Sequence, residues 1–215
     1  MKKVIEDINI LLLLISLLYK QLIYQLNDLK EAGLMGMIAA FILINVKTGM
    51  IDSVIEDLKK VVNRNPTVNT IYADSTTGKF DVFTMIEAEK MVDLHNFIVR
   101  DLQGVHGITS TITEVVTHEP PLEKIVKEST DSLKCYILMT VEVGKINEVL
   151  TSLSKATSEA SAVTRVACTT GEYDVIIRIE STDVPSLYSF ISNTIHIIEG
   201  ITSTMTHIVA REISY

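Results

Sequence analysis

Two short motifs in this sequence bring together groups that could bind a small ligand, and both motifs occur twice. The first is a glycine turn: residues 76–82 read Thr-Thr-Gly-Lys-Phe-Asp-Val, and residues 169–175 read Thr-Thr-Gly-Glu-Tyr-Asp-Val. Glycine permits a positive φ and leaves backbone N–H groups open to a ligand, while the aspartate three residues later could bind an ammonium group. The candidate binding residues of this motif are Gly78, Phe80, Asp81, Gly171, Tyr173 and Asp174.

The second motif is a threonine-rich strand. Residues 107–111 read Gly-Ile-Thr-Ser-Thr, and the same five residues recur at 200–204. Side chains alternate across a strand, so every second hydroxyl lies on the same face and could contact a ligand there. Threonine is also a good strand former and glycine a common turn residue, so a purely structural role for both motifs stays open. The candidate residues of this strand are Thr109, Thr111, Thr202 and Thr204.

The rest of the sequence offers little for catalysis. The five histidines occupy no matched positions in the two copies and lack the spacing of a metal site. The sequence contains neither a P-loop nor a nucleophile elbow. A net charge of −8 without a cluster of Lys and Arg argues against direct binding of nucleic acid. We therefore expect no catalytic residue, no metal and no cofactor.

The elements that carry these motifs also occur twice. Both motifs repeat at a spacing of 93 residues, whereas Leu58 and its upstream neighbours match Leu153 and its neighbours at a spacing of 95. A period of this length marks a small domain used twice. We place the difference of two residues between Ala73 and Thr76, so that the first copy is longer just before its glycine turn.

Each copy has the pattern strand, helix, strand, strand, helix, strand. In the second copy we expect strands at 135–143, 163–170, 173–179 and 201–209, with helices beginning at Ile146 and, capped by Asp183, near Pro185. This pattern predicts an α+β fold built from tandem ferredoxin-like βαββαβ repeats.

The composition indicates how the repeats associate. The chain is 47% hydrophobic, with a mean hydropathy of +0.30, so each small domain must cover apolar surface against a neighbour. We expect the two sheets to face each other as a pseudo-dimeric α/β barrel. Four-stranded sheets leave edges, so we also expect a homo-oligomer. The two cysteines occupy small apolar positions, which favours a reducing, cytoplasmic location.

The order "TGEYDV", helix, "GITSTMTHIV" resembles the Lrp/AsnC ligand-binding domain, also called the regulation-of-amino-acid-metabolism domain. The resemblance covers residues 38–119 and 133–213. It implies βαββαβ units that pair into a two-fold barrel, with small effectors, usually amino acids, at interfaces near the glycine turn. It also implies that the pocket uses the glycine-turn and threonine residues named above. Full-length members carry a helix-turn-helix domain first, whereas residues 1–36 are too short and leucine-rich for one.

The chain then divides into residues 1–36, a first ligand-binding domain at 37–119, a linker at 120–132 and a second ligand-binding domain at 133–215. Residues 8–19 carry no charge, but this run is shorter than the roughly 20 apolar residues of a spanning helix. Three interpretations of residues 1–36 remain open: a hydrophobic helix lying on a partner or a membrane surface, a membrane anchor, or a start codon placed too early.

The resulting hypothesis is a non-enzymatic module that senses a small molecule, in the first place an amino acid, and oligomerises in transcriptional or metabolic regulation. Its partner could be a DNA-binding Lrp/AsnC-type regulator. The alternatives are a ligand-free assembly module and a dimeric α/β-barrel enzyme, since a fold does not decide function. The Tyr173 hydroxyl and the charge of Lys79 predict that the Gly171–Asp174 site binds an amino acid more tightly than the Gly78–Asp81 site.

Overall fold

The computed structural model describes residues 37–123 and 132–213, which form two βαββαβ repeats. The first repeat comprises β1 (Ile38–Val46), α2 (Ile51–Arg64), β2 (Val68–Thr77), β3 (Val82–Ala88), α3 (Met91–Asn96), the π-helical turn η1 (Phe97–Leu102) and β4 (Ile108–His118). The second comprises β5 (Leu133–Val141), α4 (Ile146–Lys155), β6 (Ser161–Thr170), β7 (Val175–Ser181), α5 (Val184–Phe190), the π-helical turn η2 (Ile191–Ile195) and β8 (Ile201–Glu212). The α+β fold class is confirmed.

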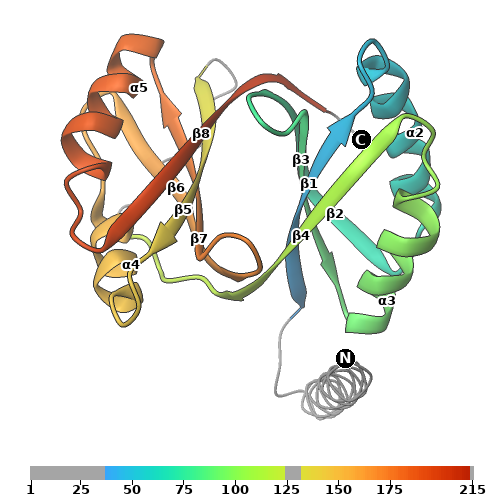
Figure 1. Ribbon diagram of the computed structural model, residues 1–215, viewed down its shortest axis with the longest axis horizontal. Helices are drawn as coiled ribbons and strands as arrows, with labels where there is room; N and C mark the ends of the chain where they lie inside the picture. The colour runs from blue at the N-terminus through green and yellow to red at the C-terminus, as the bar shows by residue number, and fades with distance from the viewer. Residues whose placement is uncertain (1–36, 124–131, 214–215) are drawn as a thin grey trace, which may run out of the picture.

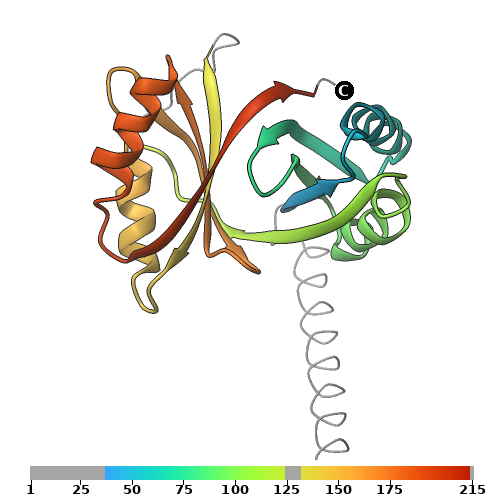
Figure 2. The ribbon, with the colours of Figure 1, turned by 45° about the horizontal axis from the view of Figure 1, so that its top comes forward.

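The eight strands form one closed antiparallel barrel in the order β1-β3-β2-β8-β5-β7-β6-β4. The two repeats lie side by side with their helices on the outer faces (Figure 1). The long strands β4 and β8 each cross to the other repeat, where β4 pairs with β6 and β8 pairs with β2 (Figure 2). The pseudo-dimeric barrel is therefore confirmed. Because each described strand has two neighbours, the expected argument for oligomerisation from free sheet edges does not hold.

The central strand of each repeat is buried on both faces, under the helices on the outside and against the barrel core on the inside. The central strands β1 and β5 are nearly continuous apolar runs, as strands buried on both faces are. In β1, Ala40, Ile42 and Ile44 pack under the helices, while Phe41 and Leu43 point into the barrel. The expected N-cap of α5 is also present, because the Asp183 side chain accepts a hydrogen bond from the Ser186 N–H.

The barrel interior is a core that both repeats share. The rings of Phe83 in the first repeat and Tyr136 in the second stack with centroids 4.7 Å apart. Neither repeat can bury this surface alone. The fully or nearly fully buried members of the shared core are Phe41, Leu43, Phe80, Phe83, Met85, Tyr136, Leu138, Ala167, Tyr173 and Ile176.

Strand register corrects the position of the two extra residues. Val68 at the start of β2 pairs with Ala88, and Ser161 at the start of β6 pairs with Ser181, so the spacing of 93 already holds at the first residue of these strands. Helix α2 has 14 residues and α4 has 10. The extra residues therefore lie between Leu58 and Val68, at the end of α2, and the expected position before the glycine turn is wrong. Strands β2 and β6 share no motif that could have aligned them, because their residues differ.

Within the described ranges, none of the helices has the length and apolar character needed to cross a membrane. The expectations for residues 1–36, including the uncharged run at 8–19, and for most of the linker at 124–131 lie outside the described residues.

The shared core predicts that the two repeats unfold together. Phe83→Ala removes a fully buried ring that contacts both repeats, and we expect a loss of about 3–5 kcal/mol in the free energy of unfolding, with one cooperative transition retained. Urea unfolding followed by circular dichroism measures both quantities. Val143→Ala, at a fully exposed position, serves as the control and should change stability by less than about 0.5 kcal/mol. Two separate transitions in the wild type would show that the repeats are independent.

Candidate functional site in the barrel

The aspartates of both glycine turns are bound to backbone. The Asp81 Oδ2 accepts a hydrogen bond from the Val46 N–H at 2.7 Å, and the Asp174 Oδ2 accepts one from the Val141 N–H at 2.7 Å. Each carboxylate thus ties its turn to the end of the central strand of its own repeat. This structural bond explains why the aspartate recurs in both copies.

The predicted glycine-turn and threonine residues do not form one pocket within the chain. Phe80 and Tyr173 point into the barrel core. Thr204 lies on the opposite face of its sheet: its Oγ1 is 3.1 Å from Nε2 of His196, at the end of η2, while its neighbour Met205 packs into the barrel. The hydroxyls of Thr109 and Thr202 donate to backbone carbonyls at 3.1 Å, Thr109 to Asn45 and Thr202 to Thr140. Thr111 is half-buried, and its neighbour Ile112 faces the barrel.

The tips of the two glycine turns meet each other. The Lys79 ammonium lies 2.7 Å from the Glu172 carboxylate and 3.2 Å from the Tyr173 hydroxyl. The hydrogen bond from Lys79 lowers the pKa of Glu172. Lys79 and Glu172 are equivalent residues of the two repeats, so this contact marks the pseudo-two-fold axis. Lys79 is therefore not an unpaired positive charge at the turn, as the expected repulsion of a ligand ammonium requires, because Glu172 already pairs with it.

Each turn packs against a buried polar side chain from the other repeat. The Glu114 carboxylate lies against Gly171 and accepts a hydrogen bond from the Glu172 N–H at 2.8 Å, while its second oxygen has no hydrogen-bond partner among the described residues. Burial raises the pKa of Glu114. At the equivalent position of the second repeat, His207 lies against Gly78, where a Cβ would come within 2.7 Å of its Nδ1.

The His207 ring is enclosed by apolar groups. It stacks on Phe80 with centroids 5.6 Å apart and tilts against Phe83 at 4.9 Å. Neither ring nitrogen makes a hydrogen bond of normal geometry with the described residues. Burial lowers the pKa of His207, against a smaller opposing effect of the Thr77 backbone. The ring is therefore neutral at pH 7.

A second pair of equivalent residues, Tyr72 and Arg165, meets further along the axis. Tyr72 lies between two guanidinium groups: Arg178 is 5.1 Å from its ring centroid and Arg165 is 5.9 Å from it. Beside them, the Tyr136 hydroxyl donates a short hydrogen bond to the Asp74 carboxylate. We call Tyr72, Asp74, Tyr136, Arg165 and Arg178 the arginine–tyrosine cluster.

The charges of the cluster are partly balanced by glutamates. Arg165 binds Glu119 through two parallel hydrogen bonds of 2.6 and 3.0 Å, and Arg178 lies 3.5 Å from Glu180. The Tyr72 hydroxyl is buried and has no hydrogen-bond partner among the described residues. Burial raises the pKa of Tyr72 far above its usual value, so this hydroxyl stays protonated and can only donate or accept as a neutral group.

Burial inside the barrel also affects the protonation of Asp74 and Tyr136 in the cluster. Burial raises the pKa of the Asp74 carboxyl, and the hydrogen bond from Tyr136 opposes that rise. Burial also raises the pKa of Tyr136 well above its usual value, which keeps its proton in the bond to Asp74. Tyr136 is thus committed to Asp74, whereas Tyr72 is the hydroxyl of the cluster that remains open to a new partner.

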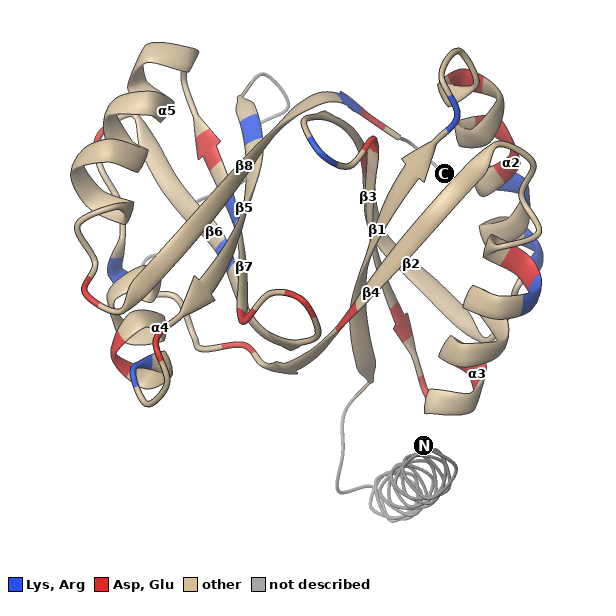
Figure 3. Cartoon of the chain, viewed as in Figure 1, with Lys and Arg blue, Asp and Glu red and all other residues tan. Residues whose placement is uncertain are grey.

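The two repeats differ sharply in the charge of their strands. Strands β5, β6, β7 and β8 carry Lys134, Arg165, Arg178 and Arg211, whereas β1, β2, β3 and β4 carry no Lys or Arg (Figure 3). Met85 stands in the first repeat where Arg178 stands in the second, and Phe41 where Tyr136 stands. The chain therefore has one arginine–tyrosine cluster and not two. The sequence analysis missed it, although an arginine inside the apolar strand Val175–Ser181, opposite a methionine in the other copy, was the available signal.

The geometry agrees with comparisons to known proteins. The family model of the Lrp/AsnC ligand-binding domain matches residues 39–128 and again 134–215, which confirms the resemblance seen in the motifs. No curated protein matches the chain. Ligand binding and assembly into oligomers are supported by the family match in general terms, without a specific effector or partner.

Several solved structures share the fold of this chain. An anthrone oxidase-like protein has a TM-score of 0.59 at 12% identity, covering 83% of this chain and 92% of its own. A chlorite dismutase from Candidatus Nitrospira defluvii has a TM-score of 0.55 at 10% identity, covering 81% and 91%. The siroheme decarboxylase NirDL has a TM-score of 0.55 at 11% identity, covering 91% and 82%. At these identities the likeness concerns the fold.

These findings contradict the expectation of a non-enzymatic amino-acid sensor in transcriptional regulation. The solved structures named above are enzymes by their titles, and the matched family model names only a ligand-binding domain. The expectation that the chain is not an enzyme is contradicted for the same reason. The glycine-turn and threonine-strand motifs identify the type of domain, but they do not identify its function, which depends on side chains inside the barrel.

Buried His207 predicts a stability that falls below neutral pH. Its pKa is lowered in the folded protein, so its contribution is complete above about pH 6.5, the pKa of an unperturbed histidine, and is lost as the pH falls towards the lowered value. We expect His207→Phe to flatten the decline in the free energy of unfolding between pH 7.5 and pH 5, measured by urea unfolding. The raised pKa values of Asp74 and Glu114 act in the opposite direction, because a carboxyl whose pKa is raised by folding favours the folded state as the pH falls.

The control for this experiment is His95→Gln, which changes an exposed histidine on α3 and should leave the pH profile as it is in the wild type. If the profile of His207→Phe also coincides with that of the wild type, the imidazole is not held neutral by the barrel.

Proposed function

The chain belongs to the Lrp/AsnC ligand-binding domain family, and we propose that it is an enzyme that acts on a carboxylate-bearing substrate at the arginine–tyrosine cluster. The observation that carries the proposal is the divergence of equivalent positions in the barrel. One repeat supplies Tyr72 and Asp74, the other supplies Tyr136, Arg165 and Arg178, and the equivalent set with the repeats exchanged is absent from the described strands.

Guanidinium groups suit a carboxylate substrate. Arginine presents a fixed fork of N–H donors that binds carboxylates through paired, charge-assisted hydrogen bonds. Glu119 engages Nε and Nη2 of Arg165, which leaves Nη1 outside that pair. The side chain of Arg165 is 23% exposed and that of Glu119 is 36% exposed, so this end of the barrel is accessible to a substrate group from solvent.

The Tyr72 hydroxyl supplies the proton. A buried hydroxyl without a partner is rare in proteins, which makes this position a candidate for contact with a substrate atom. Its raised pKa keeps the hydroxyl protonated at neutral pH, so that only a strongly basic group such as a carbanion takes its proton. When a substrate C–C bond to a carboxylate breaks and carbon dioxide leaves, the electron pair remains on carbon. Tyr72 then donates its proton to that carbon and is reprotonated from solvent through the accessible end of the barrel.

Decarboxylation is the reaction class that we place first. Support comes from the siroheme decarboxylase among the structural neighbours, whose likeness covers 91% of this chain. Arg178 is buried, and burial strengthens its interaction with a carboxylate because little water screens the charge there. The partly exposed end at Arg165 and Glu119 suits a substrate that inserts one carboxylate arm while the rest stays outside.

A haem held through a histidine does not fit this barrel. Haem iron needs an imidazole with an open position next to a slot for the macrocycle. His207 is the buried histidine of the described residues, and its ring is packed against Phe80, Phe83 and Gly78. The proposed reaction therefore does not involve a haem bound through His207.

Cellular location and assembly remain parts of the proposal. Both cysteines are free thiols, Cys135 buried and Cys168 half-buried, which supports a reducing compartment such as the cytoplasm. Oligomerisation is supported by the family match. The proposed site lies within one chain, so activity does not depend on a second copy.

The proposal predicts distinct effects for two substitutions. With siroheme as substrate, we expect the wild type to release carbon dioxide, detected as the corresponding mass loss in the product. Arg178→Met introduces the residue of the equivalent position in the first repeat and should weaken substrate binding about tenfold to a hundredfold, because a charge-assisted contact is lost. Tyr72→Phe should retain binding and lose turnover. It should not lower stability, because the hydroxyl has no hydrogen-bond partner in the barrel.

The matched control is Tyr188→Phe, which removes the hydroxyl of a tyrosine that is 74% exposed on α5. This variant should behave as the wild type. The proposed site is wrong if Tyr72→Phe and Arg178→Met both retain wild-type turnover. The proposed function is wrong if the wild type neither binds nor converts the carboxylated substrate.

A further inference from the structure

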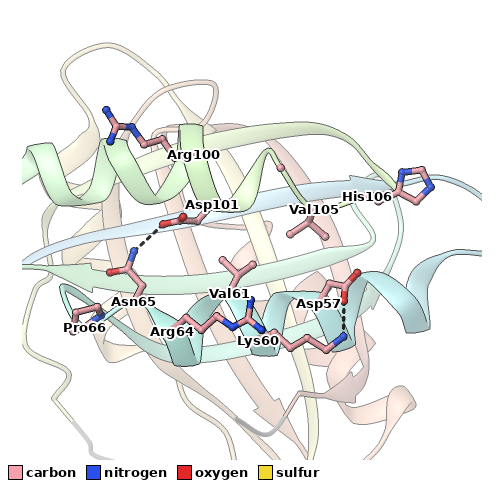
Figure 4. A pocket seen from close by; sticks show the side chains of 11 residues that line it. Asp57, Lys60, Val61, Arg64, Asn65, Pro66, Arg100, Asp101, Val105 and His106 are labelled. Atoms are coloured by element: carbon pink, nitrogen blue, oxygen red, sulfur yellow. Dashed lines mark hydrogen bonds and ion pairs between the residues drawn. The ribbon is translucent and has the colours of Figure 1, made fainter.

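The outer face of the first repeat carries a pocket of about 590 Å³ between α2 and η1 (Figure 4). It lies on the helix side of the sheet, whereas the arginine–tyrosine cluster lies inside the barrel, so the two sites are separate. A hydrogen bond of 2.8 Å from the Asn65 amide to the Asp101 carboxylate joins the end of α2 to η1 across the pocket. The volume lies in the range of small-molecule sites.

Basic side chains dominate the chemistry of this pocket. Lys60 and Arg64 lie one helical turn apart on α2, and Arg100 lies on η1. In Figure 4 the Arg100 guanidinium turns outward at the rim, and as an exposed, long side chain it can swing over the pocket. The acidic lining residues are already engaged, Asp57 by the Lys60 ammonium at 2.8 Å and Asp101 by Asn65.

Arg64 and Arg100 have no acidic partner in the described part of the chain. The whole chain has a net charge of −8 and carries 27 acidic residues, so acidic partners are abundant elsewhere on the surface. Two unpaired arginines that line one pocket in an acidic protein indicate a site for an anion from solution.

The second repeat lacks this arrangement. Asn193 stands at the position equivalent to Arg100, and Glu199 at the position equivalent to His106, a further lining residue. Helix α4 ends at Lys155, the equivalent of Lys60, so it has no counterpart of Arg64. A hollow of similar volume in the second repeat is lined without any Lys, Arg or His. The two extra residues of the first repeat lie in this region, where α2 has 14 residues and α4 has 10.

We propose that the pocket between α2 and η1 binds a small phosphate-bearing molecule. A phosphate group carries up to two charges on three oxygens, which lets it accept hydrogen bonds from cations that approach from different elements. Arg64 lies on α2 and Arg100 on η1, so they reach such a group from different elements once the Arg100 side chain swings inward. The guanidinium fork matches phosphate geometry, whereas the charge of Lys60 is already paired with Asp57. This site is independent of the proposed reaction in the barrel.

Titration calorimetry with pyrophosphate as the probe tests the proposal on the full-length chain. We expect saturable binding of one pyrophosphate per chain. Arg64→Ala and Arg100→Asn, the latter introducing the residue of the second repeat, should each weaken binding tenfold or more, and the double variant should abolish it. Because both arginines are exposed, their replacement leaves the melting temperature unchanged, which a thermal scan checks.

The matched control is Lys155→Ala, which removes the equivalent of Lys60 in the second repeat and should leave pyrophosphate binding unchanged. Absence of saturable binding by the wild type would overturn the proposal. Equal weakening by Lys155→Ala would also overturn it, because binding would then follow overall charge. Citrate provides a polycarboxylate arm, and tighter binding of citrate than of pyrophosphate would exclude a phosphate site.

Discussion

Closure of one barrel by two repeats around a pseudo-two-fold axis is the constraint on which the structure depends. Residues at equivalent positions meet on that axis: Lys79 meets Glu172, and Tyr72 meets Arg165. In a symmetric dimer of identical chains each residue would face its own copy, so a lysine on the axis would face a lysine. Duplication within one chain removes that identity. The axis can then hold an ion pair and an arginine near the ring of a tyrosine, neither of which a homodimer can form there.

The same freedom extends into the barrel. A buried charge needs partners, and a symmetric barrel would have to satisfy two copies of every buried arginine. In this chain Arg178 lies over the ring of Tyr72 and beside Glu180. The position of the first repeat that is equivalent to Arg178 holds the apolar residue Met85. Glu114 and His207 show the same divergence at the glycine turns, where one buried position holds a carboxylate and its equivalent holds a neutral imidazole. The fold therefore keeps a symmetric backbone while its interior chemistry is asymmetric.

Local patterns in the sequence predicted most of the fold. The Asp183 cap is an example, because its carboxylate accepts a hydrogen bond from the Ser186 N–H at 2.7 Å, a bond between residues close in sequence. The βαββαβ order and the barrel followed from the repeat and the family resemblance. The candidate site was harder, because its contacts join residues far apart: Tyr136 and Asp74 are 62 positions apart, and Lys79 and Glu172 are 93 apart. Spacing in the sequence also could not reveal that Asp81 is held by the Val46 backbone, or that Thr204 lies on the face opposite Tyr173. The enzyme interpretation was only an alternative, since no catalytic motif is contiguous in this chain.

The central claim is that divergence of the two repeats produced a single site in the barrel of each chain. Native mass spectrometry of the chain with siroheme counts bound molecules directly, and the masses also report the number of chains in each assembly. The account predicts saturation at one siroheme per chain, whatever the number of chains in the assembly. Saturation at two per chain, one for each repeat, would contradict it, as would a complete absence of binding.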